Sequence, residues 1–277
     1  MKIILLFIFA SLISCSTAKV QFNDIQEVYP HQLKGNIKEI TLKTTVFPKE
    51  TKDTITYRDI HQYFFNDENK VTKWISKSLN YNNSDTTLYQ YQKNLLAEKI
   101  YKDENGTHVT KMFYDKNKNR VKIQTFNNGK MGIEIENFYD KKNNISEVRT
   151  NMIEQKSKRI ETYKRDYATG IEEIITAEDG KIKSDITIKK HFNEKGIFTK
   201  SEFIYNTSTK RKFSYYTLIT YNKNGDLDCR NSFYNSGKPQ NTSCFKYKYD
   251  EKGNIILEEM FSDNALLMRS EYKIMYR

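Results

Sequence analysis

The segment Tyr249-Asp250-Glu251-Lys252-Gly253-Asn254-Ile255 decides the fold, because it is the clearest copy of a repeated pattern. In each copy an aromatic residue precedes a cluster of turn-forming residues, and an aliphatic-rich strand follows. The aromatic anchors at positions 65, 91, 114, 139, 167, 192, 221 and 249 give seven spacings over 249 − 65 = 184 residues, a mean near 26. A period of this size corresponds to one supersecondary unit per repeat.

Each unit also carries a second turn signal about halfway along, which favours two strands over a strand and a helix. The signals are Asn105-Gly106, Asn128-Gly129, Asp179-Gly180 and Ser236-Gly237. Asn-Gly and Asp-Gly accept the positive φ angles of a two-residue hairpin turn. The remaining length fits strands of roughly 7 to 10 residues and leaves no room for a parallel crossover, so we expect antiparallel pairing throughout.

Between the turns the side chains alternate with a period of two residues. Phe245-Lys246-Tyr247-Lys248-Tyr249 and the segment 271–277 place aromatic residues on one face and charged residues on the other. This alternation is typical of an antiparallel sheet with one buried face and one solvated face. The many Lys, Glu and Thr residues are then explained as the solvated face, where charges also discourage edge pairing.

These residues carry a resemblance to a known family. The copy at Tyr249–Ile255 resembles the YD repeat of bacterial Rhs-type proteins and of repeat-bearing lipoproteins of Bacteroidetes, and Leu33-Lys34-Gly35-Asn36-Ile37-Lys38-Glu39-Ile40 resembles the segment that opens the repeats in the latter group. The resemblance implies an all-β fold, a long antiparallel meander of two-stranded repeats forming an open or curled sheet superhelix. It implies no catalytic residue, because none is attached to the repeat.

The N-terminus predicts a lipoprotein. Residues 1–14 read as a signal peptide, because the apolar run Ile3–Ile13 has 11 residues and a membrane-spanning helix needs about 20. Leu12-Ile13-Ser14-Cys15 resembles the lipobox of bacterial lipoproteins, which implies that Cys15 becomes the lipidated first residue and attaches the chain to a membrane. The alternative is an ordinary secreted protein cut near residues 16–18, with Cys15 incidental.

The expected organisation is therefore a signal peptide at 1–14, a lipidated tether and cap at 15–34, and a YD-like β-repeat domain at 35–277. We expect the protein in the cell envelope, anchored by lipid to the outer membrane of a Gram-negative bacterium. The residues after Cys15 lack an early acidic residue, so the side of the membrane stays open.

The two remaining cysteines, Cys229 and Cys244, flank the turn signal Ser236-Gly237, and their mean position is (229 + 244)/2 = 236.5. A two-residue turn there places them opposite each other, within reach of a disulfide. Pro239 lies in the second strand and cannot donate to a ladder, so a wider loop would change the register. The alternative is a pair of reduced core cysteines.

Reactive chemistry is not evident in the sequence. His31, His61, His108 and His191 are scattered and lack metal-ligand spacing, so each is interpreted as a surface residue. The acidic pairs Glu172-Glu173 and Glu258-Glu259 are neighbours in strands and should point to opposite faces, which excludes a shared substrate. We therefore expect no catalytic residue, no metal, no cofactor and no enzymatic activity.

The basic excess does not predict nucleic-acid binding. The chain has 46 Lys plus Arg against 35 Asp plus Glu, and 37 of the basic residues are Lys. Nucleic-acid readers favour arginine forks and stacked aromatics on one surface, whereas here the aromatics alternate away from the lysines. A solvated Lys-rich surface explains the charge.

The function predicted from the sequence is that of a lipid-anchored cell-envelope protein whose non-catalytic repeat domain is a scaffold or binds an unknown envelope protein or glycan. One alternative is an immunity or antitoxin-like protein of a toxin system, because Rhs-type repeats accompany toxins. A second alternative is an envelope enzyme with a site that the sequence does not reveal.

Overall fold

The computed structural model describes residues 33–47, 57–81, 83–166, 168, 171–193, 197–205 and 213–277. Within these ranges the chain forms strands and turns and no helix, so the predicted all-β class is confirmed. The strands are β1 (Ile37–Val46), β2 (Tyr57–Phe65), β3 (Val71–Ser78), β4 (Asn83–Gln92), β5 (Leu95–Asp103), β6 (Gly106–Tyr114), β7 (Arg120–Asn127), β8 (Lys130–Tyr139), β9 (Ile145–Met152), β10 (Ser157–Asp166), β11 (Ile171–Glu178), β12 (Lys181–Phe192), β13 (Phe198–Tyr205), β14 (Phe213–Tyr221), β15 (Leu227–Tyr234), β16 (Pro239–Tyr249), β17 (Ile255–Ser262) and β18 (Ala265–Tyr276).

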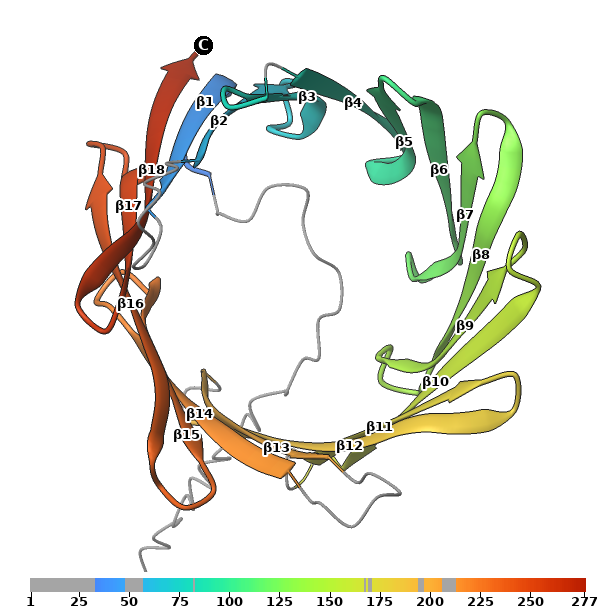
Figure 1. Cartoon of the computed structure of the whole chain (residues 1–277). Coiled ribbons are helices and arrows are strands. Elements are labelled where there is room, and N and C mark those ends of the chain that lie inside the picture. The colour runs from blue at the N-terminus through green and yellow to red at the C-terminus, as the bar shows by residue number, and fades with distance from the viewer. Residues whose placement is uncertain are drawn as a thin grey trace, which may run out of the picture.

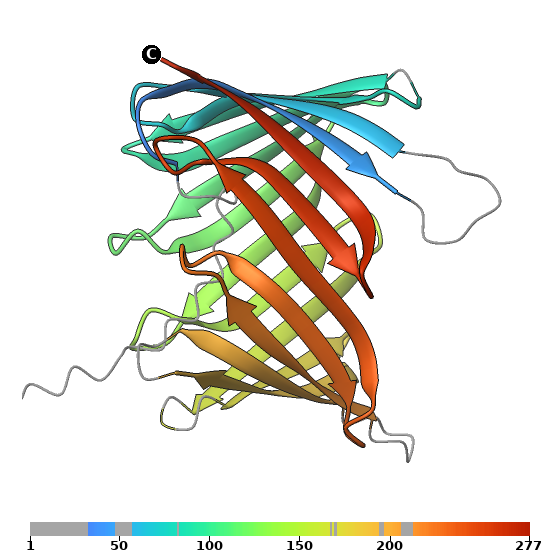
Figure 2. The ribbon, with the colours of Figure 1, turned by 90° about the vertical axis from the view of Figure 1, so that its left-hand side faces the viewer.

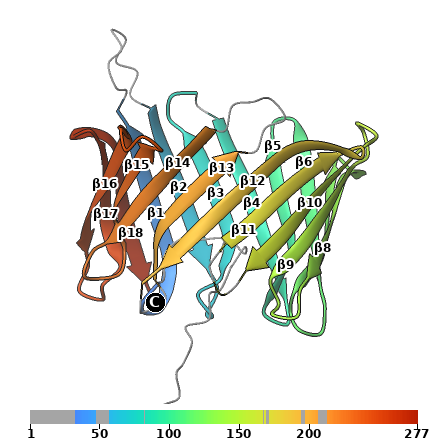
Figure 3. The ribbon, with the colours of Figure 1, turned by 90° about the horizontal axis from the view of Figure 1, so that it is seen from below.

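The strands form a closed barrel. Each strand pairs antiparallel with the next along the chain, as expected for a meander of hairpins, and β1 pairs with both β2 and β18. The wall is a ring when seen along the barrel axis (Figure 1), and its strands run obliquely to that axis in the two side views (Figure 2 and Figure 3). The expected open or curled superhelix is therefore wrong, because the first and last strands join.

A β-bulge at each aromatic anchor gives the physical reason for closure. The register shifts by one residue between the anchor and the residue before it at every anchor that lies in a described strand: 65, 91, 114, 139, 192, 221 and 249. The weaker anchor at 167 lies outside the described residues. A bulge bends its strand and increases the local twist, so regularly spaced bulges curl a sheet steadily in one direction.

The residue after each anchor organises a five-residue loop. The side chain of Asp115 accepts hydrogen bonds from the backbone N–H groups of Asn117 (2.8 Å) and Asn119 (2.9 Å). Asn66, Asp140, Asn222 and Asp250 make the same pair of bonds in their own loops. The fourth loop residue has positive φ, which asparagine and glycine tolerate best. These loops lie at one end of the barrel, which we call the Asx-loop rim.

Tyrosine hydroxyls tie neighbouring units together near this rim. Tyr91 donates to the carbonyl of Val71 at 2.8 Å, Tyr114 to that of Leu96 at 2.8 Å, and Tyr139 to that of Arg120 at 2.9 Å. Each bond spans 18 to 20 residues of sequence, so it links one repeat to the repeat before it. Each of these tyrosine anchors thus lies at the bulge of its own strand and is hydrogen-bonded to the preceding repeat.

Short hairpins occupy the opposite end, the hairpin rim. Asn128-Gly129 and Asp179-Gly180 have positive φ at both positions, as predicted for two-residue hairpin turns. The turn predicted at Asn105-Gly106 is shifted by one residue, because Asp103 and Gly106 are paired and the Asp103 side chain accepts from the N–H groups of Asn105 and Gly106. The Ser236-Gly237 turn is a wider loop between Tyr234 and Pro239.

The buried strand residues share one face of the sheet. Ile40, Thr87, Thr176, Ser201 and Ser270 are each less than 9 % exposed, although four of them are small polar residues. Side chains on the concave face of a closed sheet converge and cover one another, so this is the inner face. The predicted division into aromatic and charged faces is only partly right, because the inner face also carries charged residues and the outer face exposes apolar ones, including Phe113, Phe138 and Leu218.

The most apolar part of the inner face lies beside the seam between β1 and β18. Ile37, Ile40, Phe65, Val71 and Tyr89 form a buried cluster, with Tyr272, Ile274 and Tyr276 of β18 packed against it. Asn254 fastens the seam from the loop after β16: its side chain accepts from Lys34 N (2.7 Å) and donates to Lys34 O (2.9 Å) and to the Tyr276 hydroxyl (2.7 Å).

Asn254→Ala should therefore weaken the barrel more than a loop substitution elsewhere. We expect the free energy of unfolding to fall by about 2–3 kcal/mol, because the buried Asn254 side chain makes three hydrogen bonds across the seam and each contributes about 1 kcal/mol. Asn119→Ala is the matched control, since Asn119 occupies the same loop position away from the seam. Its amide donates to Asp115 Oδ2 (3.1 Å) and to Asn143 Oδ1 of the next loop (3.3 Å). Urea unfolding measures both, and equal losses would contradict the role of Asn254 at the seam.

The tyrosines should make the barrel sensitive to alkali. Burial, followed by the neighbouring Tyr114, raises the pKa of Tyr91 to about 12 from the ordinary 10.0. A raised pKa contributes stability that is fully present below pH 10 and is lost as the pH rises through the folded value. The free energy of unfolding should therefore fall between pH 10 and 12.

Tyr91→Phe separates the hydrogen bond of this tyrosine from its ionisation. At pH 7 the variant should lose about 1 kcal/mol, the usual net contribution of one hydrogen bond. Above pH 10 its stability should decline less steeply than that of the unmodified chain. Urea unfolding at pH 7, 10, 11 and 12 tests this, and parallel pH profiles would refute the assignment.

Candidate functional site

The inner wall of the barrel is the candidate site. No described strand comes within 8 Å, Cα to Cα, of any strand other than its two neighbours, so the wall does not collapse across the ring. Eighteen strands about 4.8 Å apart and tilted by about 40° give a backbone diameter of roughly 35 Å, and barrels of this strand number enclose a space that their own side chains do not fill.

A row of polar and aromatic side chains crosses the inner wall from β2 to β7. Its members lie directly opposite one another on successive strands, so all of them face the interior: Tyr63, Trp74, Thr87, Tyr101, His108 and Asn127. The rings of Tyr63 and Trp74 are stacked, with centroids 6.2 Å apart. The rings of Tyr101 and His108 lie 5.6 Å apart, and His108 Nδ1 is 2.8 Å from Asn127 Oδ1.

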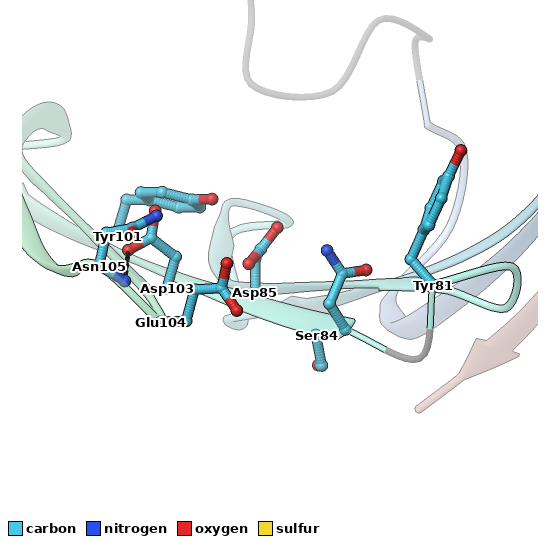
Figure 4. Close-up of a pocket in the computed structure, with 8 residues that line it drawn as sticks. Tyr81, Ser84, Asp85, Tyr101, Asp103, Glu104 and Asn105 are labelled. Atoms are coloured by element: carbon cyan, nitrogen blue, oxygen red, sulfur yellow. Dashed lines mark hydrogen bonds between the residues drawn. The ribbon is translucent and has the colours of Figure 1, made fainter.

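A recess of about 380 Å³ adjoins this row at the hairpin rim. It is lined by residues of β4, β5 and the turns beside them: Tyr81, Asn83, Ser84, Asp85, Tyr101, Asp103, Glu104 and Asn105. Figure 4 shows the carboxylates of Asp85 and Glu104 between the rings of Tyr81 and Tyr101, with the carboxylate of Asp103 beside the Tyr101 ring. The side chains of Asp85, Tyr101 and Asp103 point to one side of the sheet, as their shared inner-face register requires.

The recess is electronegative, in contrast to the basic chain as a whole. Its lining carries three carboxylates and neither Lys nor Arg. Burial, with further contributions from the carboxylates of Asp85 and Asp103, raises the pKa of the Tyr101 phenol. His108 Nε2 lies 3.6 Å from Asp103 Oδ2 and is the basic group that the structure places beside this carboxylate.

Five side-chain polar atoms of the described residues are buried without a hydrogen-bond partner. Three of them lie on adjacent strands of this wall: His61 Nδ1 on β2, Trp74 Nε1 on β3 and Thr87 Oγ1 on β4. The other two, Arg120 Nε and Ser157 Oγ, lie on β7 and β10. The rings of His61 and Trp74 lie 5.7 Å apart, and Thr87, which is 1 % exposed, is paired in register with both Trp74 and Tyr101. Unpaired buried polar atoms in a native fold call for an explanation such as a bound water or ligand.

The histidines are placed differently from their interpretation as surface residues. His61 and His108 lie half-buried on the inner wall, and burial lowers the pKa of His61. His191 Nε2 pairs with Glu202 Oε1 at 3.0 Å, and His31 lies outside the described residues. Among the residues that the structure describes, no group of three or more His, Cys, Asp or Glu is arranged to hold a metal.

The two acidic pairs behave as the strand pattern predicts. Glu172 lies on the inner face, 3 % exposed, and bonds Arg165 Nε and Lys190 Nζ at 2.7 Å each, whereas Glu173 projects from the opposite face. Glu258 and Glu259 likewise point to opposite faces, with Glu259 bound by Arg269. Neither pair brings two carboxylates to one substrate.

The three predicted cysteine sites have different outcomes. Cys15 and the signal peptide lie outside the described residues. Cys229 and Cys244 are directly opposite each other on β15 and β16 and are joined by a disulfide, with a Cα–Cα distance of 4.1 Å. The wider loop at Pro239 leaves this pairing intact, because a bulge between Ser232 and Phe233 takes up the extra residue.

No sequence pattern pointed to the recess. Asp85, Thr87 and Tyr101 are ordinary polar and aromatic members of an alternating strand, and only the inward curvature brings them together. The one feature that sets the region apart in sequence is Trp74, the single tryptophan of the chain.

Comparison with known proteins finds similarity among solved structures. No protein-family model and no curated protein matches the chain. Among solved structures, a porin-like protein from Bacteroides uniformis is 12 % identical over 88 % of this chain and 99 % of its own, with a TM-score of 0.46. A porin-like protein from Bacteroides vulgatus is 11 % identical over 85 % and 97 %, with a TM-score of 0.42. A LolA-superfamily protein from Nitrosomonas europaea is 8 % identical over 91 % and 89 %, with a TM-score of 0.24.

In the described part of the chain, no helix has the length and apolar character to cross a bilayer.

The disulfide gives a direct test of the β15–β16 register. Peptide mapping of the protein alkylated under denaturing, non-reducing conditions should recover Cys229 and Cys244 in one linked species. Replacing both with serine should lower the free energy of unfolding by up to about 3 kcal/mol, the value for closing a loop of 15 residues. Wild-type protein in reductant is the control and should match the double variant; two alkylated thiols in the untreated protein would contradict the pairing.

Proposed function

We propose that this protein is a lipid-anchored component of the bacterial cell envelope whose barrel is a non-catalytic binding scaffold, with the ligand held against the inner wall. The observation that carries the proposal is the recess at the hairpin rim, where carboxylates and aromatic rings meet on one concave surface. The adjoining inner wall holds buried polar atoms that lack a hydrogen-bond partner. Binding sites are typically concave, with a few polar groups set among aromatic ones.

The outer wall supports a barrel that stands in water rather than in lipid. Charged side chains occupy the middle of the strands on this face, as in the pairs Lys122–Glu134 (3.2 Å), Lys200–Glu202 (2.7 Å) and Arg269–Glu259 (2.7 Å). Lys or Arg on the lipid-facing side of a membrane barrel costs about 2–4 kcal/mol at the bilayer midplane. We therefore do not propose a porin-like role for this chain. In the proposal, the lipid on Cys15 attaches the barrel to the membrane.

The proposed anchor is Cys15, in the outer membrane of a Gram-negative bacterium. Several acyl chains give durable attachment, since each buried CH₂ contributes about 0.8 kcal/mol. Arg277 N donates to Asn36 O, so the first and last described segments meet at the Asx-loop rim. The described chain therefore starts at this rim, and the recess opens at the far rim.

Cys15→Ala tests the anchor. The unmodified chain should incorporate labelled palmitate, depend on lipoprotein signal peptidase for processing, and fractionate with membranes. The variant should lose the label, and globomycin should have no further effect on its processing. Cys229→Ser is the matched cysteine control and should keep the label; unlabelled wild-type protein processed normally in globomycin would refute the lipid anchor.

A further inference from the structure

We infer that the recess and the inner wall beside it form a binding site for a neutral saccharide. This inference rests on the proposed binding role of the inner wall and names its ligand class. The site combines the recess, including Asp85, Tyr101 and Asp103, with three residues of the adjoining wall that lie outside its lining, and is called the β2–β6 site below. The three wall residues are His61, Trp74 and Thr87.

The charge of the β2–β6 site excludes anionic ligands. Asp85, Asp103 and Glu104 face one recess whose described lining includes no Lys or Arg. Bringing a phosphate, a uronic acid or a nucleic acid to this surface would add like charges at short range in a partly enclosed space. The ligand must instead donate hydrogen bonds to carboxylates, which accept only.

The unpaired atoms distinguish a hydroxyl-bearing ligand from a cation. An ammonium group also donates to carboxylates, but it has no lone pair to offer Trp74 Nε1, which is a donor only. Thr87 Oγ1, 1 % exposed and next to Asp85 on the inner face of β4, both donates and accepts. A ligand with several hydroxyls both donates and accepts, and so satisfies all of these groups together.

The aromatic rings complete the match to a sugar. Tyr81 is 69 % exposed at one side of the recess and Tyr101 stands at the other, so each presents a ring to a bound molecule. A pyranose ring has an apolar face of C–H groups that stacks on such rings, while its hydroxyls point outward to polar partners. The recess volume of about 380 Å³ lies in the range of small-molecule sites.

Burial of the unpaired atoms predicts that ligand binding changes the tryptophan fluorescence. Trp74 Nε1 and Thr87 Oγ1 have almost no exposed surface, so a ligand hydroxyl reaches them only when the neighbouring rings move. Trp74 is the only tryptophan in the chain. Binding at this site should therefore change the intrinsic tryptophan fluorescence, and that change reports on this wall alone.

The test titrates the full processed chain in a detergent that has no sugar headgroup. The neutral probes are hexasaccharides of glucose, mannose, galactose and N-acetylglucosamine, and the cationic probes are spermine and the chitosan hexamer, which is the deacetylated form of the last saccharide. Trp74 fluorescence and calorimetry follow binding. At least one neutral hexasaccharide should bind and shift the fluorescence, and the chitosan hexamer should bind no more tightly than its N-acetylated form.

Variants locate the binding. Asp85→Asn with Asp103→Asn should weaken the affinity at least tenfold, and Thr87→Val should weaken it several-fold. Glu98→Gln is the matched control, because Glu98 lies on β5 but on the outer face, and its affinity should stay within twofold of wild type. Unchanged thermal unfolding of each variant shows that the barrel is intact.

Three outcomes would overturn the inference: no neutral hexasaccharide binds, binding is the same in the Asp85/Asp103 and Thr87 variants, or only spermine and the chitosan hexamer bind. If only spermine and the chitosan hexamer bind, and the Asp85/Asp103 variant no longer binds them, the inner wall is still a binding surface. The saccharide inference alone would then be wrong. Failure of the anchor is read separately, from the palmitate label on Cys15.

Discussion

The β-bulge at each aromatic anchor of the described strands is what allows the barrel to form. These bulges bend the repeats in the same direction, so the meander returns to its start and β1 pairs with β18. Closure removes both sheet edges and their unpaired backbone groups, which would otherwise be free to pair with other chains. Closure also creates an inner face. On an open sheet, Asp85, Thr87 and Tyr101 would lie on a surface exposed to solvent and would not line an enclosed wall.

The repeated pair of an aromatic residue and Asp or Asn performs three tasks. The tyrosine bends the strand and bonds the preceding repeat: Tyr114 and Tyr139 donate to the carbonyls of Leu96 and Arg120, and Tyr249 donates to the Asp226 carboxylate. The aspartate or asparagine that follows closes the loop by accepting two backbone N–H groups. Both residues act within their own loop and on the adjoining repeat. The other positions of the repeat can therefore vary, provided that an aromatic residue is followed by Asp or Asn.

Local features could be predicted from the sequence, whereas closure and the candidate site could not. Asn128-Gly129 and Asp179-Gly180 form the expected turns, because their backbone preferences act within the turn itself. The pairing of Cys229 and Cys244 could also be predicted, because the two residues are only 15 positions apart and belong to one hairpin. The β1–β18 pairing joins segments more than 200 residues apart, and no local pattern specifies it. Thr87 and Asp85 look like any solvated strand residues until the curvature turns them inward.

Cross-linking across the β1–β18 seam shows directly whether the barrel is closed. Thr41 and Lys273 are directly opposite on β1 and β18 and lie on the outer face, so cysteines at both positions should form an intramolecular disulfide without added linker. Thr41→Cys with Lys246→Cys on β16 is the unpaired control. A closed barrel predicts a linked peptide in the first variant and free engineered thiols in the second. Free thiols in both, or links only between molecules, would show that the sheet stays open.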